Sequence, residues 1–342
     1  MAQTHQTTAG YNVTVGSTTF KQQQPNGMLQ LVVEDHVDMS SVCQITVSTA
    51  EAQPTGSYGI GDKVSVKLTS EESIFDGEVV SIRHSFQAQG TSSIVLEAID
   101  HIHRLGRGRK TRFWNDMTDS DVVKEVAAEA QLEVDAEGTT ETHSYILQRN
   151  ESNVAFLKRL AARNDFQLRV EPGKILFKTA ETGGQTTQIA AGAGLISMSV
   201  NYNSAELVQE VVVRGWDIKT KKEIVGKATA ADVAAIGQGG KGGEHASVFG
   251  EATAYITDIP ISSQSAADQV AKAEMERIAR RFCKGKCSII GDDSVRAGTV
   301  IEFSNIGSSL GGKFYVISTR HMIAPSSGYR TEVSFCSNSD GS

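Results

Sequence analysis

Cysteine and proline are scarce in this sequence, and basic residues do not predominate. Its 342 residues include four cysteines and five prolines, against 32 glycines. Four scattered cysteines are too few for a disulfide framework, and the turns are expected to use glycine dihedrals more than proline. The formal net charge of −7 argues against a protein that binds nucleic acid specifically through phosphate contacts.

Long apolar runs are also missing. No segment approaches the roughly 20 apolar residues of a membrane-spanning helix, and residues 1–10 are polar, without the apolar core of a signal peptide. We therefore expect no membrane insertion, and synthesis in the cytoplasm. The composition, 39% hydrophobic and 21% charged, is typical of a globular protein, and the length allows two or three domains.

Two pairs of residues have spacings that metal ligands use. Cys283 and Cys287 form a C-x-x-x-C pair without a second pair nearby, and His101 and His103 would lie on one face of a strand. A zinc site needs about four ligands. Free thiols are therefore the favoured interpretation of the cysteines and no metal site is predicted, with a metal-binding module as the alternative.

No motif indicates catalysis. H-E-x-x-H and Walker A sequences are absent, and Gly239–Gly243 lacks the end of a phosphate-binding loop, so a flexible linker is expected there. Asp292 and Asp293 would point to opposite faces of a strand and are better explained as a hairpin loop, and Asp100 as a turn residue. We predict a chain that is not an enzyme, with no catalytic, cofactor-binding or metal residues.

A repeated β-unit is the most informative feature of the sequence. Three strand-like segments recur in the same order near the C-terminus: Gly61–Leu68, Glu78–Phe86 and Ile94–Asp100 match Gly298–Phe303, Phe314–Ile323 and Thr331–Phe335. Ser-x-Arg-His recurs in register, so Arg83 and His84 correspond to Arg320 and His321. Because these residues occur twice, they are expected to serve the shared fold or a repeated contact rather than chemistry.

The patterning predicts an α+β fold, mainly β, with two similar β-barrel tube domains and inserted α+β modules. Helices are expected after the capping candidates Thr118, Thr229 and Ser265, and from about Glu151 to Arg163. The expected units are residues 1–105 (a loose arm and the first barrel), 106–197 (an inserted α+β module), 198–220 with 286–342 (the second barrel, split, with Val208–Trp216 as its first strand) and 221–285 (an inserted helical and loop module).

The sequence resembles the phage late control D family, the baseplate hub proteins of contractile tails. The resemblance is carried by seven segments: Gly291–Val300, Gly312–Ile317, His321, Gly328–Thr331, Arg112–Val123, Gln148–Leu160 and Val211–Lys227. It covers roughly residues 10–336. The hub half of the VgrG spike proteins of type VI secretion is similar.

The resemblance implies a homotrimer in which each chain supplies two tube-type barrels. Such a trimer would present near-sixfold symmetry to the tail tube above and threefold symmetry to the central spike below. The implied function is a structural baseplate hub of a contractile injection machine, such as a phage tail, a tailocin or an extracellular injection system. Its partners would be the tail-tube protein, the spike protein and other baseplate proteins.

Two alternatives to this hub stay open. One is a VgrG-like hub of type VI secretion that lacks its spike domain, and the other is a tail-tip peptidoglycan hydrolase. Because the chain ends shortly after the second barrel, the spike is expected to be a separate chain. The acidic balance of the sequence also predicts an electronegative channel wall.

Overall fold

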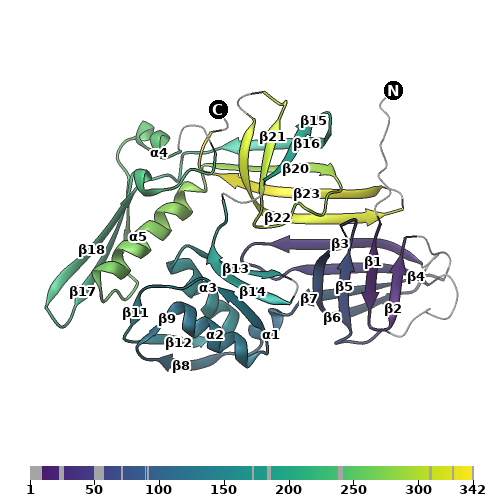
Figure 1. The fold of residues 1–342 in the computed structure, drawn as a ribbon, viewed down its shortest axis with the longest axis horizontal. Helices are drawn as coiled ribbons and strands as arrows, with labels where there is room; N and C mark the ends of the chain where they lie inside the picture. The colour runs from purple at the N-terminus through teal and green to yellow at the C-terminus, as the bar shows by residue number, and fades with distance from the viewer. Residues whose placement is uncertain are drawn as a thin grey trace.

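The computed structural model describes residues 10–22, 27–49, 58–70, 72–88, 90, 92–171, 173–182, 186–237, 242–307, 310–325 and 327–340. Over these residues the chain is mainly β, as the patterning predicts, and the helices lie in two peripheral parts (Figure 1). Residues 1–9 of the expected arm and most of Gly239–Gly243 lie outside the described residues.

The N-terminal unit is a sheet of seven strands around its own core. Its strands are β1 (Asn12–Val15), β2 (Thr18–Lys21), β3 (Met28–His36), β4 (Val42–Thr49), β5 (Lys63–Lys67), β6 (Ser73–Ser85) and β7 (Ser92–Asp100). They are hydrogen-bonded in the order β2-β1-β5-β6-β7-β4-β3. Alternation buries Val13 and Val15 of β1 against Val64 and Val66 of β5, which is the period expected of strands with one apolar face.

An α+β module follows the N-terminal unit and has a separate core. Its elements are α1 (His103–Gly106), β8 (Lys110–Trp114), β9 (Met117–Thr118), α2 (Asp119–Glu129), β10 (Glu133–Ala136), β11 (Thr142–His143), β12 (Ile146–Glu151), α3 (Asn153–Arg163), β13 (Phe166–Glu171) and β14 (Lys174–Thr179). Thr118 caps α2 as expected, its hydroxyl accepting from the Asp121 N–H at 3.3 Å. The apolar stripes of α2 and α3 meet the small sheet β10-β14-β13 in one cluster.

The C-terminal unit closes on itself as a six-stranded ring. It consists of β15 (Thr186–Ala191), β16 (Gly194–Tyr202), β20 (Cys283–Ile290), β21 (Val300–Ser304), β22 (Gly312–Ala324) and β23 (Gly328–Ser337). Pairing runs β22-β21-β15-β16-β20-β23 and returns through β22–β23. One of the two expected barrels is therefore closed, whereas the pairings of the N-terminal unit do not close over the residues that the structure describes.

The segment between β16 and β20 forms an extension beside the closed ring. It contains β17 (Glu210–Asp217), β18 (Lys222–Thr229), η1 (Ala230–Asp232), α4 (Gly242–His245), η2 (Ala246–Phe249), β19 (Thr253–Ile256) and α5 (Gln264–Ala279). The segment Val208–Trp216, expected as a strand of the second barrel, instead forms β17 in a separate sheet ordered β18-β17-β19. One helix expectation also changes, because α5 begins after the cap Ser263, two residues before Ser265. Thr229 opens a short helix as expected, η1.

Five strands of the two β-units share one topology. The N-terminal order β5-β6-β7-β4-β3 matches the C-terminal order β21-β22-β23-β20-β16, with every pairing antiparallel, whereas the strand beside β5 is antiparallel (β1) and the one beside β21 is parallel (β15). The pairing of β6 with β7 shifts register between Val79 and Ser81, and the pairing of β22 with β23 shifts between Val316 and Ser318, the matching positions of the repeat. Such a shift is typical of a β-bulge. The repeat read from the sequence is thus confirmed down to a backbone irregularity.

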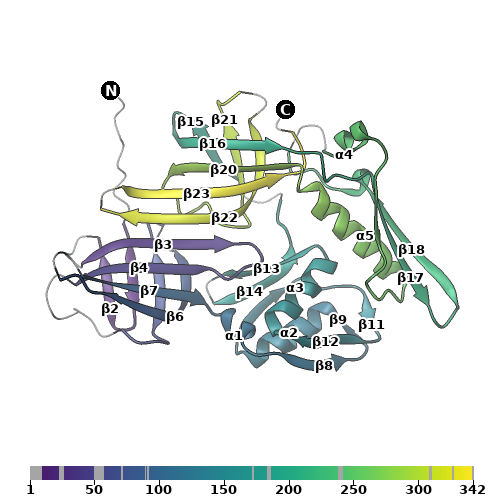
Figure 2. The ribbon, with the colours of Figure 1, turned by 180° about the vertical axis from the view of Figure 1, so that it is seen from behind.

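The units join edge to edge into one antiparallel run. Figure 2 shows β16, β20, β23, β22, β3, β4, β7 and β6 side by side, in that order. The join is the pairing of β22 with β3, in which Arg320 lies opposite Glu34. Eight strands of one chain therefore form a single curved sheet, with β6 at one end and β16 at the other.

Candidate assembly and channel surface

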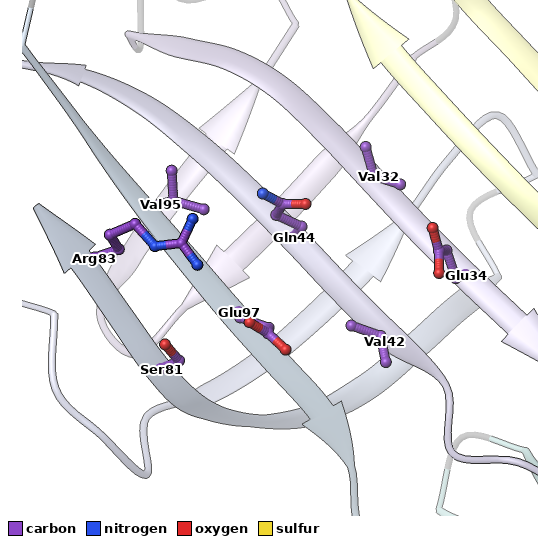
Figure 3. Close-up of a pocket in the computed structure, with 8 residues that line it drawn as sticks. All are labelled: Val32, Glu34, Val42, Gln44, Ser81, Arg83, Val95 and Glu97. Carbon is purple, nitrogen blue, oxygen red and sulfur yellow. The ribbon is translucent and has the colours of Figure 1, made fainter. Parts of the chain in front are cut away.

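The eight-stranded run has one face packed on the two β-cores and an opposite face that carries mainly polar side chains. We call the second one the polar face. In the N-terminal unit its side chains line a shallow hollow, shown in Figure 3: Val32, Glu34, Val42, Gln44, Ser81, Arg83, Val95 and Glu97. In the C-terminal unit they include Ser197, Ser199, Lys286, Ser288, Ser318, Arg320, Glu332 and Ser334.

The same positions of the repeat build the polar face in both units. Ser81 and Arg83 of β6 correspond to Ser318 and Arg320 of β22, and each serine follows the register shift of its own strand. Glu97 lies opposite Ser81, as Ser334 lies opposite Ser318. The face is thus a duplicated surface, which fits the expectation that the repeated Arg serves a repeated contact.

Charges on the polar face are mixed. Arg320 bridges the join between the units, with its Nε 3.0 Å from the Glu34 carboxylate and its Nη1 3.5 Å from that of Glu332. The strand registers place charges of both signs on this face, including Arg83, Lys284, Lys286, Arg320 and Arg330 as well as Glu34, Glu78, Glu97 and Glu332. Acidic side chains therefore do not predominate on this face, and the acidic channel wall expected from the net charge stays a prediction.

The two repeated histidines have opposite environments. His84 is exposed near the end of β6, whereas His321 is 1% exposed, with its Nδ1 3.0 Å from the Tyr329 hydroxyl and 3.2 Å from that of Thr331. Burial lowers the pKa of His321 from its ordinary value to about 3, so the ring is neutral at physiological pH. A buried neutral imidazole held by two hydroxyls serves packing.

His101 and His103 do not share a strand face, contrary to the expectation, because β7 ends at Asp100 and His103 already belongs to α1. Both rings instead approach the Glu78 carboxylate, each at 3.9 Å, and Arg104 pairs with the same carboxylate. Partial burial opposes ionisation of Glu78, but the Arg104 guanidinium outweighs it and holds the pKa of Glu78 below its usual range. In this cluster the Arg104 guanidinium pairs with the carboxylate that the two imidazoles approach.

Cys283 and Cys287 both lie on β20 and are buried in the core of the closed ring. Burial raises the pKa of each thiol to about 12, so neither is a ready thiolate. No group of three or more His, Cys, Asp or Glu side chains suited to a metal ion occurs among the described residues. Across that same part of the chain, no helix is both long and apolar enough to cross a bilayer.

The acidic candidates have structural contacts. Asp292 and Asp293 lie in the loop after β20, which is not the expected hairpin because β20 and β21 do not pair. Asp293 accepts from the N–H and the hydroxyl of Ser70, each at 2.8 Å. Asp100 ends β7 and accepts from the N–H of Ile102 at 3.1 Å and from that of Ser41 at 2.5 Å. Burial raises the pKa of Asp100 to about 6. These carboxylates fasten loops and turns.

Comparison with solved structures places this architecture among tail proteins. The 43 kDa tail protein of prophage MuSo2 from Shewanella oneidensis superposes with a TM-score of 0.75 at 12% identity, over 96% of this chain and 98% of that one. The tail protein from Neisseria meningitidis MC58 gives 0.74 at 13%, over 96% of each chain. An E. coli component of the type VI secretion system, itself described as similar to bacteriophage T4 tail proteins, gives 0.66 at 10%, over 96% of this chain and 77% of that one.

The fold is therefore that of phage-tail and type VI secretion proteins. By sequence, the chain belongs to the family described as the Alg8 N-terminal domain, whose model matches residues 6–325. The matching family is not late control D, so the finer part of the expected resemblance is not established. A search of curated proteins finds no significant match.

Proposed function

We propose that this chain is a structural hub of a contractile injection machine, a homotrimer that adapts a threefold central spike to a sixfold tail tube. The observation that carries the proposal is the duplicated β-unit. Five strands of each copy share their order and the position of a bulge, and the two copies lie edge to edge in one sheet. The fold shared with tail proteins over nearly the whole chain supports the same setting.

The duplication of the β-unit would allow a threefold assembly to match a sixfold one. A ring of six identical tube subunits needs six similar docking edges, whereas a threefold spike offers three. Three chains with two similar units each would present six similar β-units around one axis. The polar face would then line a channel, since a mixed and hydrated wall lets cargo slide without strong adhesion to one sign of charge.

A VgrG-like hub of type VI secretion is the second candidate. The similarity to an E. coli type VI component favours it, although that protein is longer than the region it shares with this chain. The partners separate the two candidates. A tail-like particle would retain this chain together with sheath and fibre proteins, whereas a type VI apparatus would retain it with a membrane-anchored complex.

The mass of the full chain in solution tests the proposal. We expect three copies per particle by light scattering or native mass spectrometry, and co-purification with a tube protein and a spike protein when these are expressed together. A stable monomer or dimer that binds neither protein would contradict the hub function. Activity in a zymogram of bacterial cell wall would contradict the prediction that the chain is not an enzyme.

A further inference from the structure

Both ends of the eight-stranded run are open strand edges. In β6, residues 73–78 pair with β5, and β7 joins the other side of the strand from Gly77 onward, but from Ser81 to Ser85 only β7 is paired. In β16, β15 pairs with Gly194 and Leu195, and from Ser197 to Asn201 only β20 is paired over the described residues. Long open edges are templates for further strands.

The chain itself shows how such edges pair. At the join between the units, Ser318–Ile323 of β22 pairs antiparallel with Leu31–His36 of β3. Within the repeat, β22 is the counterpart of β6 and β3 is the counterpart of β16. The β22–β3 join within the chain is thus a template for a second join, between β6 and β16. One chain cannot make this second join with itself, because β6 and β16 lie at opposite ends of its eight-stranded run.

Register shifts fix how β3 and β16 correspond. The pairing of β3 with β4 shifts between Met28 and Gln30, and that of β16 with β20 shifts between Leu195 and Ser197. Aligning these shifts matches Leu31 to Met198 and Glu34 to Asn201. The residue that faces Arg320 across the join is Glu34, so the residue that would face Arg83 is Asn201.

We propose that the open edge of β6, extended to Phe86, pairs antiparallel with the open edge of β16 in a second copy of this chain, with Arg83 opposite Asn201. The proposal rests on the trimeric hub proposed above and names its subunit contact. Three chains would close a cylinder of twenty-four strands, eight from each, in which joins within chains alternate with joins between chains.

The burial of matching side chains supports a second copy of this chain as the partner of the β6 edge. Phe86 is 85% exposed, whereas its counterpart Ile323 is 8% exposed because it packs at the β22–β3 join against the N-terminal core. The same contrast holds across the join: Leu31 and Val33 of β3 are buried, while their counterparts Met198 and Val200 are only partly so. A second copy would cover Phe86 with Met198 and Val200, as this chain covers Ile323 with its own β3.

Disulfide trapping tests the register. In the full chain carrying Arg83→Cys and Asn201→Cys, directly opposed positions of an antiparallel pair lie within disulfide range. We expect oxidation to give covalent dimers and trimers and nothing larger. The native cysteines are buried, so they should contribute little crosslinking of their own. The matched control combines Arg83→Cys with Ser197→Cys, on the same face but about 13 Å out of register along the strand, and should stay uncrosslinked.

The outcomes separate this proposal from the hub function. Trimers by mass with crosslinking only of the in-register pair support both. Trimers by mass that crosslink only in the control pair, or in neither, overturn the β6–β16 contact and leave the hub function standing. A wild-type chain that stays monomeric overturns the contact together with the trimer.

A second variant tests the apolar part of the contact. Phe86→Ser should raise the dissociation constant of the trimer at least tenfold without lowering the unfolding temperature of the isolated subunit, because the ring is exposed in one copy. Phe249→Ser, at another exposed ring (79%) in η2, is the control and should leave the trimer unchanged. Equal behaviour of the two variants would contradict the proposed contact.

Discussion

Side chains at matching positions of the repeat differ most in burial. His84 and His321 occupy the same position of the Ser-x-Arg-His motif, yet only His321 lies in a core, beside Tyr329 and Thr331. The difference arises because β3 covers the edge of β22 at this point, while β6 has an open edge. One motif therefore has a packing role in one unit and a surface role in the other.

Burial of His321 should make the folded state sensitive to acid. Its pKa is about 3 when folded, against an ordinary value of 6.5. Above pH 6.5 neither state binds the proton and the site has no effect. As the pH falls from 6.5 towards 3, the unfolded chain gains a proton that the folded chain refuses, so this site lowers the free energy of unfolding by up to about 1.4 kcal/mol per pH unit.

Denaturant unfolding across this pH range measures the effect. Between pH 6.5 and pH 4, His321→Asn should make the free energy of unfolding depend less steeply on pH than in the wild type. His84→Asn, at the exposed counterpart, should leave this dependence as it is in the wild type. Slopes that are identical in all three proteins would show that His321 does not titrate on unfolding as its burial requires.

The sequence predicted part of this residue-level arrangement. The repeat identified Arg83, His84, Arg320 and His321, but it could not separate the exposed histidine from the buried one, because burial depends on which edge another strand covers. Glu34 and Lys286 were missed altogether. A polar residue that alternates along a strand shows its face only once its register with neighbouring strands is known.

Strands and helices were easier to predict than their partners. The repeated strand-like segments located β5, β7, β21 and β23, and helical spacing located α2, α3 and most of α5. The strand Val208–Trp216 was recognised but assigned to the wrong sheet, because a period of two identifies a strand and not its neighbours. It pairs with β18 and β19, and α5 packs across β17 and β18 in a core continuous with the closed ring.

Close approach of α5 to β18 depends on Gly226. A Cβ atom at this position would lie 2.3 Å from the carbonyl carbon of Ala267, so Gly226→Ala must push the helix away from the strand. We expect a loss of about 1–3 kcal/mol in the free energy of unfolding, typical of overpacking. Thermal unfolding would measure it, with Gly138→Ala as the control, since nothing lies within 4 Å of a Cβ there. Equal effects of the two changes would argue against tight packing of α5.

For the whole molecule, the decisive contact is the join between the two β-units. Pairing of β3 with β22 is reinforced by Asp35, which is 2% exposed and whose Oδ2 lies 3.0 Å from Nε of Arg296 in the loop before β21. The Ser41 hydroxyl donates to the same carboxylate at 3.1 Å. A buried carboxylate that depends on an arginine of the other unit makes the two units one body.

Arg296→Ala should therefore loosen the whole chain. Removing one partner of a buried ion pair leaves Asp35 uncompensated, at a cost of about 3 kcal/mol. Arg320→Ala removes an exposed pair at the same join and should cost less than about 1 kcal/mol. Denaturant unfolding compares the two variants, and limited proteolysis would show whether the units separate first in Arg296→Ala. Similar losses in both would mean that burial of Asp35 does not strengthen the join.

The shared register shift after Val79 and after Val316 has a consequence for how this sheet can vary. A bulge bends a strand through its backbone, so the bend does not depend on the side chains that surround it. Val95 and Glu332 hold matching places in the two units, one neutral and one charged, on strands that follow the same course. Related chains that keep the two bulges would thus retain the same curve of the sheet while the chemistry of its polar face diverges.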